Sequence, residues 1–382
     1  MVLYISKRSK YDVGSVTHLQ ALKDIYGEDN VIYIDFNFSM PAKNEKNYIC
    51  YGKYSGRAER LKRVIQRNTM IISNEIINNL CEIVRNENID IIFSEESTLG
   101  TFYKQVKKIK KDIKIITFYH DIGADLFRQW RKQPGLLNKI ENSLSIYQEK
   151  MCVKYGDYNW VFHQTDFEKF NKFYGSVPDA MIPLASPVPV AIKQMQNKGE
   201  MQSDKIKKLL FVGSSYYPNV IGIRWFVKNV LPELDKNIQL VIVGRGLEFL
   251  KNEFQDPRVN VVGTVETPVP YYLDADIFIA PLFDGGGMKV KSIEAISYGK
   301  CFVGTEESLH GFWEELSNAV RNKFIYKVNT KEEWIEILNK LATQDIYKFN
   351  KTVFDDFYSH FSYETMKKSF EEQLKRINKE SK

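Results

Sequence analysis

The sequence predicts an α/β protein built from two doubly wound, Rossmann-like domains. Short apolar runs rich in β-branched residues alternate with helix-length amphipathic stretches along the whole chain, a pattern typical of mostly parallel sheets covered by helices. The alternation stops at a polar segment near the middle and then starts again. The 382 residues also exceed what one compact core usually holds and suit two domains of ordinary size.

The first half of the chain supplies the elements of one such domain. Its strand-like runs are VLYI, VIYID, IDIIFS, IKIITFY and YNWVF. The helix-like stretches between them cover residues 17–25, 72–85, 100–111 and 138–155. We therefore expect an N-terminal domain over residues 1–190, on the acceptor side of a cleft between two domains.

A linker and a second domain follow. The segment PVPVAIKQMQNKGEMQSDKI has no sustained period for either element, so we predict a linker over residues 191–206. The alternation then restarts with KLLFVG, QLVIVG, VNVVG, DIFIAPL and CFVGT, with helices over residues 219–234 and 288–298. This pattern predicts a second domain over residues 207–360 and a final helix, residues 361–382, that packs back toward the first domain.

Composition excludes several classes of protein. No run approaches the roughly 20 apolar residues of a membrane-spanning helix. We expect no signal peptide, because charged residues follow the short apolar stretch at the N-terminus. The four cysteines are scattered without the spacing of a zinc site or disulfide framework. Apolar residues at 43% and charged residues at 27% are typical of a folded soluble protein. We expect a cytoplasmic protein.

Two basic segments have two interpretations. Cationic residues gather in residues 57–67 and in residues 104–114. Each segment is either the solvated face of a helix or a surface that attracts anionic lipid head groups. No nucleic-acid-binding module is recognisable among these residues. The functional alternative is therefore peripheral attachment to the inner face of a membrane.

The strongest local signal is APLFDGGGMKVKSIEAISYGKCFVGT, residues 280–305. Three glycines after an apolar strand, followed by a helix with lysines in its first turn, form a loop whose N–H groups can approach a phosphate closely. Glu294 follows within that helix and can accept two hydrogen bonds from a ribose diol. Alternatively, Glu294 is an exposed helix residue with no role in binding. The segment predicts a nucleotide-binding turn.

A companion turn lies in FVGSSYYPNVIGIRWF, residues 211–226. Gly213 permits a sharp exit from the strand, and Ser214 and Ser215 add hydroxyl and N–H groups. Ligands of open α/β sheets bind at the carboxyl ends of strands. Both turns are therefore expected to face the cleft between the domains.

In this order and spacing, the motifs of residues 208–312 resemble the donor domain of the retaining glycosyltransferases grouped as family 4, which have the GT-B architecture. The resemblance implies that Glu294 binds the donor ribose and that backbone near Val265 meets the base. It implies that the loop of residues 284–289 holds diphosphate and sugar. That loop includes Asp284, Gly285, Gly286, Gly287 and Met288.

The resemblance extends to the first domain in outline. Gly14 and Ser15 follow the first strand, as does the family's turn that faces the diphosphate. His120 occupies the place of a histidine near the transferred sugar, where it would position the substrate together with its neighbour Asp121. His120 and Asp121 are alternatively a buried structural pair. His18 is the other histidine near a turn that faces the cleft.

The sequence departs from the family in two places. Many members carry an acid eight positions before the residue matching Glu294, where this chain has Gly286. Asp284 is the nearest substitute for that acid. Many members also have an Arg and a Lys where this chain has Ser214, Ser215 and Asn219. Diphosphate charge must then be met by Lys289, Lys291, Arg224 or backbone dipoles, and Lys289 is the first choice as a catalytic cation.

The resemblance implies an enzyme that moves a sugar from a nucleoside-diphosphate sugar to a saccharide or lipid-linked acceptor, with retention, in cell-surface polysaccharide synthesis. The sugar nucleotide is a co-substrate, and no cofactor or metal is expected, because the protein mainly holds the leaving diphosphate and aligns the acceptor. Two alternatives stay open. One is a non-catalytic subunit that binds or chaperones a glycosyltransferase, and the other is a sugar-nucleotide epimerase.

Overall fold

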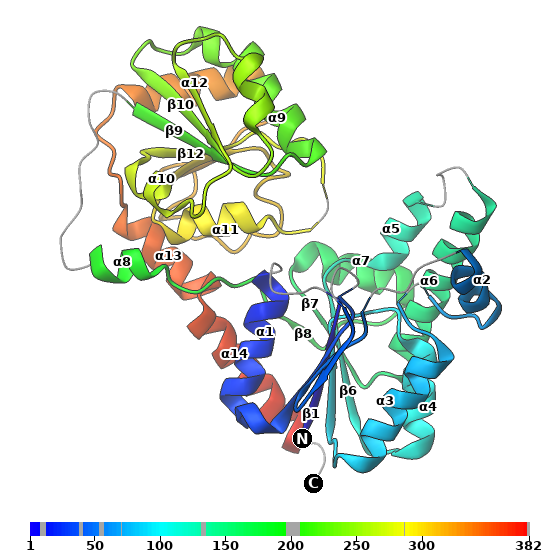
Figure 1. The fold of residues 1–382 in the computed structure, drawn as a ribbon. Helices are drawn as coiled ribbons and strands as arrows, with labels where there is room; N and C mark the ends of the chain where they lie inside the picture. Colours follow the sequence, from blue (N-terminus) through cyan, green and yellow to red (C-terminus); the bar gives the residue numbers. More distant parts are fainter. Residues whose placement is uncertain are drawn as a thin grey trace. The chain divides into compact units, whose positions relative to one another are not determined.

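The structure is a computed structural model that describes residues 1–7, 13–37, 41–52, 57–69, 71–130, 135–195, 207–285 and 287–379. The chain divides into two compact units (Figure 1). The first unit comprises Met1–Leu184 and Lys367–Lys382, and the second comprises Ala185–Met366. Each is an α/β unit around a largely parallel sheet, which confirms the predicted fold class.

The sheet of the first unit has eight strands in the order β3-β4-β2-β1-β5-β6-β7-β8. All neighbours pair in parallel except β3 and β4. The strands are β1 (Val2–Ser6), β2 (Val31–Asp35), β3 (Lys43–Glu45), β4 (Tyr48–Cys50), β5 (Ile91–Ser94), β6 (Lys114–Tyr119), β7 (Tyr158–Val161) and β8 (Ala180–Met181). The strand order reverses between β1 and β5, which makes this point the topological switch of the sheet.

Helices cover both faces of this sheet. They are α1 (Val13–Tyr26), η1 (Glu28–Asn30), α2 (Arg57–Ile65), α3 (Asn74–Asn86), α4 (Gly100–Ile109), α5 (Gly123–Trp130), α6 (Leu136–Tyr155), α7 (Gln164–Tyr174) and part of α14 (Tyr363–Lys379). Side chains alternate along each strand. Leu3 and Ile5 therefore pack with Leu80 of α3 and Phe102 of α4, whereas Tyr4 points to the opposite face.

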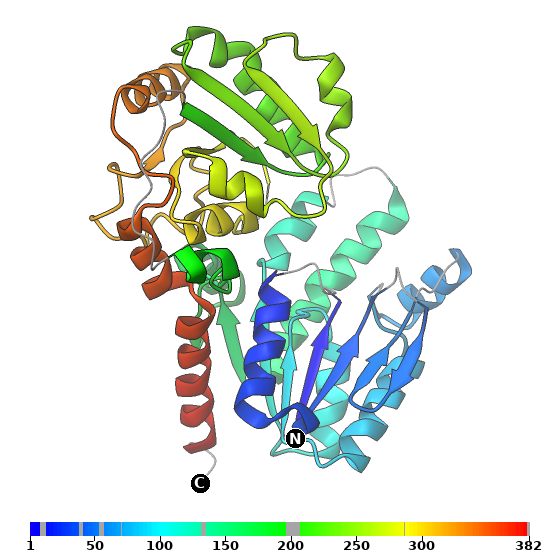
Figure 2. The ribbon, with the colours of Figure 1, turned by 60° about the vertical axis from the view of Figure 1, so that its left-hand side comes forward.

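The opposite face lies under α1 and α14, which run side by side in Figures 1 and 2. Phe370 of α14 packs against Phe93 and Trp160, with ring centroids 5.5 and 5.3 Å apart. It also lies 5.0 Å from the His18 ring of α1. The C-terminal helix thus completes the core of the first unit.

The second unit has a six-stranded sheet in the order β11-β10-β9-β12-β13-β14. The strands are β9 (Lys207–Val212), β10 (Ile238–Val243), β11 (Val259–Gly263), β12 (Ile277–Ala280), β13 (Cys301–Gly304) and β14 (Ile325–Lys327). The strand order reverses between β9 and β12. One core cluster joins Leu209 and Phe211 of β9 to Phe226 and Trp334 of the covering helices.

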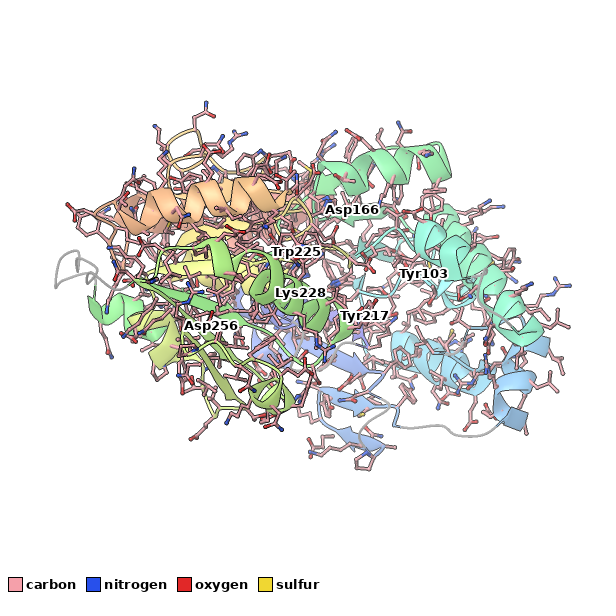
Figure 3. All side chains as sticks on the ribbon, turned by 90° about the horizontal axis from the view of Figure 1, so that it is seen from above. Tyr103, Asp166, Tyr217, Trp225, Lys228 and Asp256 are labelled. Carbon is pink, nitrogen blue, oxygen red and sulfur yellow. The ribbon has the colours of Figure 1, made fainter. Side chains whose placement is uncertain are left out.

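The helices of the second unit begin with α8 (Val190–Met195), inside the segment expected to be a linker. Residues 196–206 of that segment lie outside the described residues. The other helices are α9 (Tyr217–Asn229), η2 (Leu231–Glu233), η3 (Glu248–Asn252), α10 (Val269–Asp274), α11 (Val290–Ser297), α12 (Lys331–Ala342) and α13 (Lys351–Phe361). Figure 3 labels three positions along α9: Tyr217, Trp225 and Lys228.

The start of α11 differs from the prediction. The helix was expected to begin at Met288, but it begins at Val290, and Lys289 is its N-cap with extended backbone. The two glycines described before it have φ of 141° at Gly285 and 63° at Gly287. The turn continues past these glycines to Lys289, whose extended backbone keeps it out of the helix.

Among the described residues, no helix is long and apolar enough to span a membrane.

Candidate functional site

The second unit gathers its glycine turns at the carboxyl ends of neighbouring strands. Gly213 follows β9, Gly244 follows β10, and Gly263 ends β11. Gly213 N donates to Val243 O at 3.0 Å, and Gly244 N donates to Gly263 O at 2.8 Å. A β-carbon on Gly244 would lie 1.5 Å from Gly213 O, so only glycine permits this approach. The backbones therefore form one continuous rim beside the β9–β12 switch point.

The turn after β9 carries the two predicted serines. Ser215 N donates to Arg245 O at 3.0 Å, which joins this turn to the one after β10. Ser214 O accepts from Asn219 Nδ2 at 3.0 Å, at the start of α9. Ser215 is exposed and Ser214 is partly exposed. Both side chains lie on the rim.

The glycine-rich turn after β12 reaches the same rim. Asp284 is exposed, and its Oδ1 accepts from Gly285 N at 2.8 Å. Gly287 and Met288 are partly buried, while Gly286 lies outside the described residues. Lys289 Nζ donates to Gly287 O at 2.7 Å and pairs with Glu307 Oε1 at 2.5 Å. The predicted catalytic cation therefore already neutralises a carboxylate.

Lys291 is the cation that faces the turn after β9. Its Nζ donates to Asn219 Oδ1, lies 5.0 Å from the centroid of the Phe211 ring, and would lie 3.1 Å from a β-carbon on Gly213. Burial, and secondarily the neighbouring Lys289, lowers the pKa of Lys291 to about 7. The sequence named Lys291 only as an alternative because it could not tell which face of α11 meets β9.

Glu294 lies on the same helix, one turn further along. Its Oε2 accepts a hydrogen bond from the Tyr272 hydroxyl at 3.1 Å. Tyr272 in turn stacks on Tyr298 with ring centroids 4.5 Å apart. Burial raises the pKa of Glu294, and the Tyr272 hydrogen bond opposes that rise. Glu294 is thus a partly buried carboxylate with one oxygen held by its neighbour, rather than a freely exposed helix residue.

Val265 follows the end of β11. Thr264 N, the preceding amide, donates to Glu248 Oε1 at 2.7 Å. Gly246 N donates to Thr264 Oγ1 at 3.2 Å, which ties the loop to the turn after β10. Val265 is partly buried, so its backbone stands at the β10–β11 end of the rim.

In the first unit, Gly14 and Ser15 lie within the first turn of α1 rather than in a turn before it. Both are buried. A β-carbon on Gly14 would lie 3.3 Å from His120 Cε1 and from the Phe162 ring. The glycine therefore lets α1 approach His120. Asp121, the next residue, is partly exposed.

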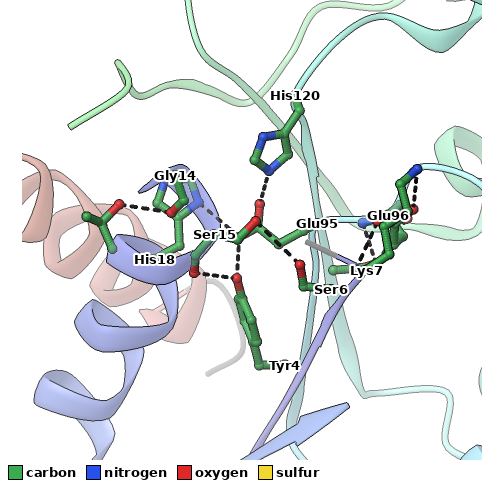
Figure 4. Close-up of polar contacts among 11 residues, drawn as sticks. Tyr4, Ser6, Lys7, Gly14, Ser15, His18, Glu95, Glu96 and His120 are labelled. Atoms are coloured by element: carbon green, nitrogen blue, oxygen red, sulfur yellow. Dashed lines mark hydrogen bonds and ion pairs between the residues drawn. The ribbon is translucent and has the colours of Figure 1, made fainter. Parts of the chain in front are cut away.

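His120 belongs to a buried cluster that the sequence analysis did not identify (Figure 4). Glu95 accepts from His120 Nε2 through Oε2 and lies 2.9 Å from His18 Nδ1 through Oε1. Glu95 was not named as a candidate. The available signal was an acidic residue directly after β5, at the switch point of the sheet.

One comparison with known proteins concerns the second unit. Residues 206–344 match the sequence profile of the family described as Glycosyl transferases group 1. No curated protein sequence matches the chain.

Solved structures similar to the whole chain have the GT-B fold. Anabaena HepE in complex with UDP and glucose has a TM-score of 0.65 at 12% identity, covering 98% of this chain and 99% of that one. The lipopolysaccharide outer core galactosyltransferase WaaB has a TM-score of 0.66 at 13% identity, covering 98% of each chain. The catalytic domain of starch synthase IV from Arabidopsis thaliana, bound to ADP and acarbose, has a TM-score of 0.64 at 11% identity, covering 98% and 99%. These likenesses confirm the predicted GT-B architecture.

Proposed function

We propose that this chain, whose residues 206–344 match the family described as Glycosyl transferases group 1, transfers a sugar from a nucleoside-diphosphate sugar to a saccharide or lipid-linked acceptor. Retention of anomeric configuration and a role in cell-surface polysaccharide synthesis are part of the proposal. The observation that carries it is the rim of glycine turns beside the β9–β12 switch point, with Lys291 and Glu294 on the adjoining helix. The similar structure of HepE contains UDP and glucose, which supports a donor of this class.

Each feature of the rim has a proposed role. Glu294 binds the ribose diol, backbone at Val265 meets the base, and Ser214 and Ser215 contact the diphosphate. The loop from Asp284 to Met288, Gly286 included, holds the diphosphate and the sugar. Lys291 faces the diphosphate directly, while Lys289 fixes the loop through Glu307 and Gly287.

In the proposed reaction the bond between the anomeric carbon and the diphosphate oxygen breaks as the acceptor oxygen attacks from the same face. The acceptor proton passes to the leaving phosphate oxygen. Preorganised positive charge stabilises the growing negative charge on the diphosphate. Lys291, the N-terminus of α11 and the loop N–H groups supply that charge, so we propose turnover that needs neither a metal nor a cofactor. His120 and Asp121 of the first unit position the transferred sugar, and Gly14 and Ser15 meet the diphosphate.

Membrane attachment is a further part of the proposal, but the two basic segments do not act together. Lys107 binds Ile113 O at 2.7 Å and Asp157, just before the amino ends of β6 and β7. Arg60 of α2 pairs with Glu141 near the start of α6, and α6 ends beside the amino end of β7. The segments therefore lie at opposite ends of the first unit.

The α2 end has the features of a membrane-docking surface. Leu61 is 52% exposed, Ile65 is 73% exposed, and Leu136 at the start of α6 is 77% exposed. Lys62 and Arg67 are exposed beside them. Exposed apolar side chains with two neighbouring cations match an anionic lipid surface. We refer to these five residues as the α2 rim and propose that it brings the enzyme to a lipid-linked acceptor.

A thermal-shift screen of nucleoside diphosphates and their sugars tests the donor assignment, because a bound donor stabilises the folded protein by mass action. The expected result is stabilisation by nucleotides that share one base, followed by release of labelled nucleotide from the matching sugar donor. No stabilisation by any nucleotide contradicts the proposal. Stabilisation without turnover, with any acceptor tried, supports the non-catalytic subunit instead, an alternative favoured by Gly286 in place of an acid.

A further inference from the structure

The residues around His120 come from three neighbouring strands and one helix. Side chains two residues apart share a face of a strand. Tyr4 of β1 is in register with Phe93 of β5, and Glu95 stands two residues beyond Phe93. His120 directly follows β6, and α1 covers this face with His18 (Figure 4). The cluster therefore lies at the β1–β5 switch point of the first sheet.

Glu95 is the centre of the cluster. One carboxylate oxygen accepts from His120 Nε2, and the other lies 2.9 Å from His18 Nδ1 and 3.1 Å from the Tyr4 hydroxyl. Glu95 and His18 are buried, and 6% of the His120 side chain is exposed. Although burial alone would raise the pKa of Glu95, the two imidazoles hold it well below its usual range. The carboxylate is therefore ionised.

An ionised carboxylate only accepts hydrogen bonds. The two ring nitrogens that face it, His120 Nε2 and His18 Nδ1, must then each carry a hydrogen. His18 Nε2 is buried and has no hydrogen-bond partner within the described residues. His120 keeps its second nitrogen, Nδ1, for a ligand. Gly14 packs against the Cε1 edge of the same ring, where a β-carbon would lie 3.3 Å away.

On the premise of the proposed function, we propose that Glu95 is a positioning residue, which fixes the orientation and tautomer of His120 so that Nδ1 is presented to the donor sugar. His18 holds the carboxylate in place from its other side, where the Tyr4 hydroxyl lies between Glu95 and Ser15 O, 2.7 Å from the latter. A buried carboxylate with two imidazoles is rarely the most stable way to fill a core. The cluster lies at the switch point, where ligands of such sheets bind, and this position favours a role in ligand binding over a role in stability.

The first test needs no variant. In spectra of protein labelled with ¹⁵N-histidine, the inference requires a proton on His18 Nδ1 and a proton on His120 Nε2. Loss of the His120 signals in His120→Ala assigns them. Finding His18 as the Nε2–H form overturns the inference. This measurement stands whether or not a sugar donor has been identified.

The second test is kinetic and uses Glu95→Gln, which keeps the size of the side chain but can accept from only one of the two imidazoles. We expect kcat to fall about 10- to 100-fold, as when the partner that orients a functional histidine is removed, with little change in donor KM. Glu96→Gln is the matched control. Glu96 is also buried, but it binds the backbone and side chain of Lys7 at 3.2 and 3.4 Å.

A double-mutant cycle distinguishes positioning from a general effect on folding. If Glu95 acts through His120, the Glu95→Gln/His120→Ala double variant loses no more activity than His120→Ala alone. Additive losses, or full activity in Glu95→Gln, overturn the inference. If the parent protein turns over no donor, the proposed function fails, and the tautomer measurement then decides this inference by itself.

Discussion

At the scale of single residues, Glu294 is the side chain on which donor affinity is expected to depend most. Loss of a charge-assisted hydrogen bond to the ribose costs about 1.5 to 3 kcal/mol, so Glu294→Ala should weaken donor binding roughly 10- to 100-fold in calorimetry. The variant also leaves the Tyr272 hydroxyl without its partner, so a lower melting temperature is expected. Tyr272→Phe is the control, since it removes the hydrogen bond and retains the carboxylate. Unchanged affinity in Glu294→Ala would remove this residue from the site.

Two lysines of one segment are expected to behave differently. Lys291 faces Gly213 and has a pKa of about 7, whereas Lys289 pairs with Glu307. The diphosphate favours charged Lys291, and the free protein loses that charge above pH 7. Donor affinity should therefore fall as pH rises from neutral, and Lys291→Met should abolish this dependence and weaken binding about 10-fold or more. Lys289→Met should retain the pH dependence. The reverse pattern would restore Lys289 as the catalytic cation.

At the scale of elements, α9 must lie close to the end of β12. A β-carbon on Gly222 would lie 1.8 Å from Pro281 O, a backbone atom that cannot rotate away. Gly222→Ala should push α9 off the glycine-rich turn, lower the melting temperature by several degrees and weaken nucleotide binding. Ile221→Ala is the control, because Ile221 lies on the same helix and is 40% exposed. Equal stability of both variants would show that the turn adapts.

Glu149 of α6 joins three elements of the first unit. It accepts from Ser97 Oγ at 2.7 Å, from Gly123 N of α5 at 3.1 Å, and from the Tyr174 hydroxyl of α7. Burial raises the pKa of Glu149 to about 7, against these hydrogen bonds, from an ordinary value of 4.5. The folded state thus retains a proton that the unfolded chain has already lost between those two values.

The consequence is a stability that decreases with pH. Below 4.5 both states are protonated and the contribution is complete, and it is lost as pH rises toward 7. At about 1.4 kcal/mol per pKa unit, the change is on the order of 3 kcal/mol. Glu149→Gln should remove this contribution to the slope in urea unfolding between about pH 5 and pH 8, whereas Glu168→Gln, a change at an exposed residue of α7, should not. Parallel slopes in all three proteins would contradict the prediction.

At the scale of the whole molecule, the α2 rim should determine attachment to anionic liposomes. Each exposed cation contributes about 1 kcal/mol near such a surface, and the apolar side chains add their burial. Leu61→Ser/Ile65→Ser should reduce cosedimentation at least several-fold, and salt should weaken what remains. Lys104→Ser/Lys111→Ser is the control, because these exposed lysines belong to the basic segment at the opposite end of the first unit. Binding lost only in the lysine variant would assign docking to that segment.

Much of the fold could be predicted because its signals are local. The alternation of β-branched runs with amphipathic stretches predicted two doubly wound sheets, and the glycines after the strands predicted where the chain must turn sharply. The sequence therefore predicted Gly213 and Gly285 as parts of the rim of glycine turns in the second unit. Element ends were less accurate. The start of α11 was expected two residues too early, because a run of glycines leaves open how far the turn extends before the helix begins.

What only the tertiary structure decided is which distant side chains meet. His18 lies 77 positions from Glu95, and His120 lies 25 positions from it, so no motif connects them. Strand order places β1, β5 and β6 side by side, and the alternation of side chains along those strands then turns Tyr4, Glu95 and His120 to one face under α1. Likewise, the rotation of α11 against β9 directs Lys291, and not Lys289, to Gly213. Periodicity determines the elements, whereas their register and rotation follow from packing between segments far apart in the chain.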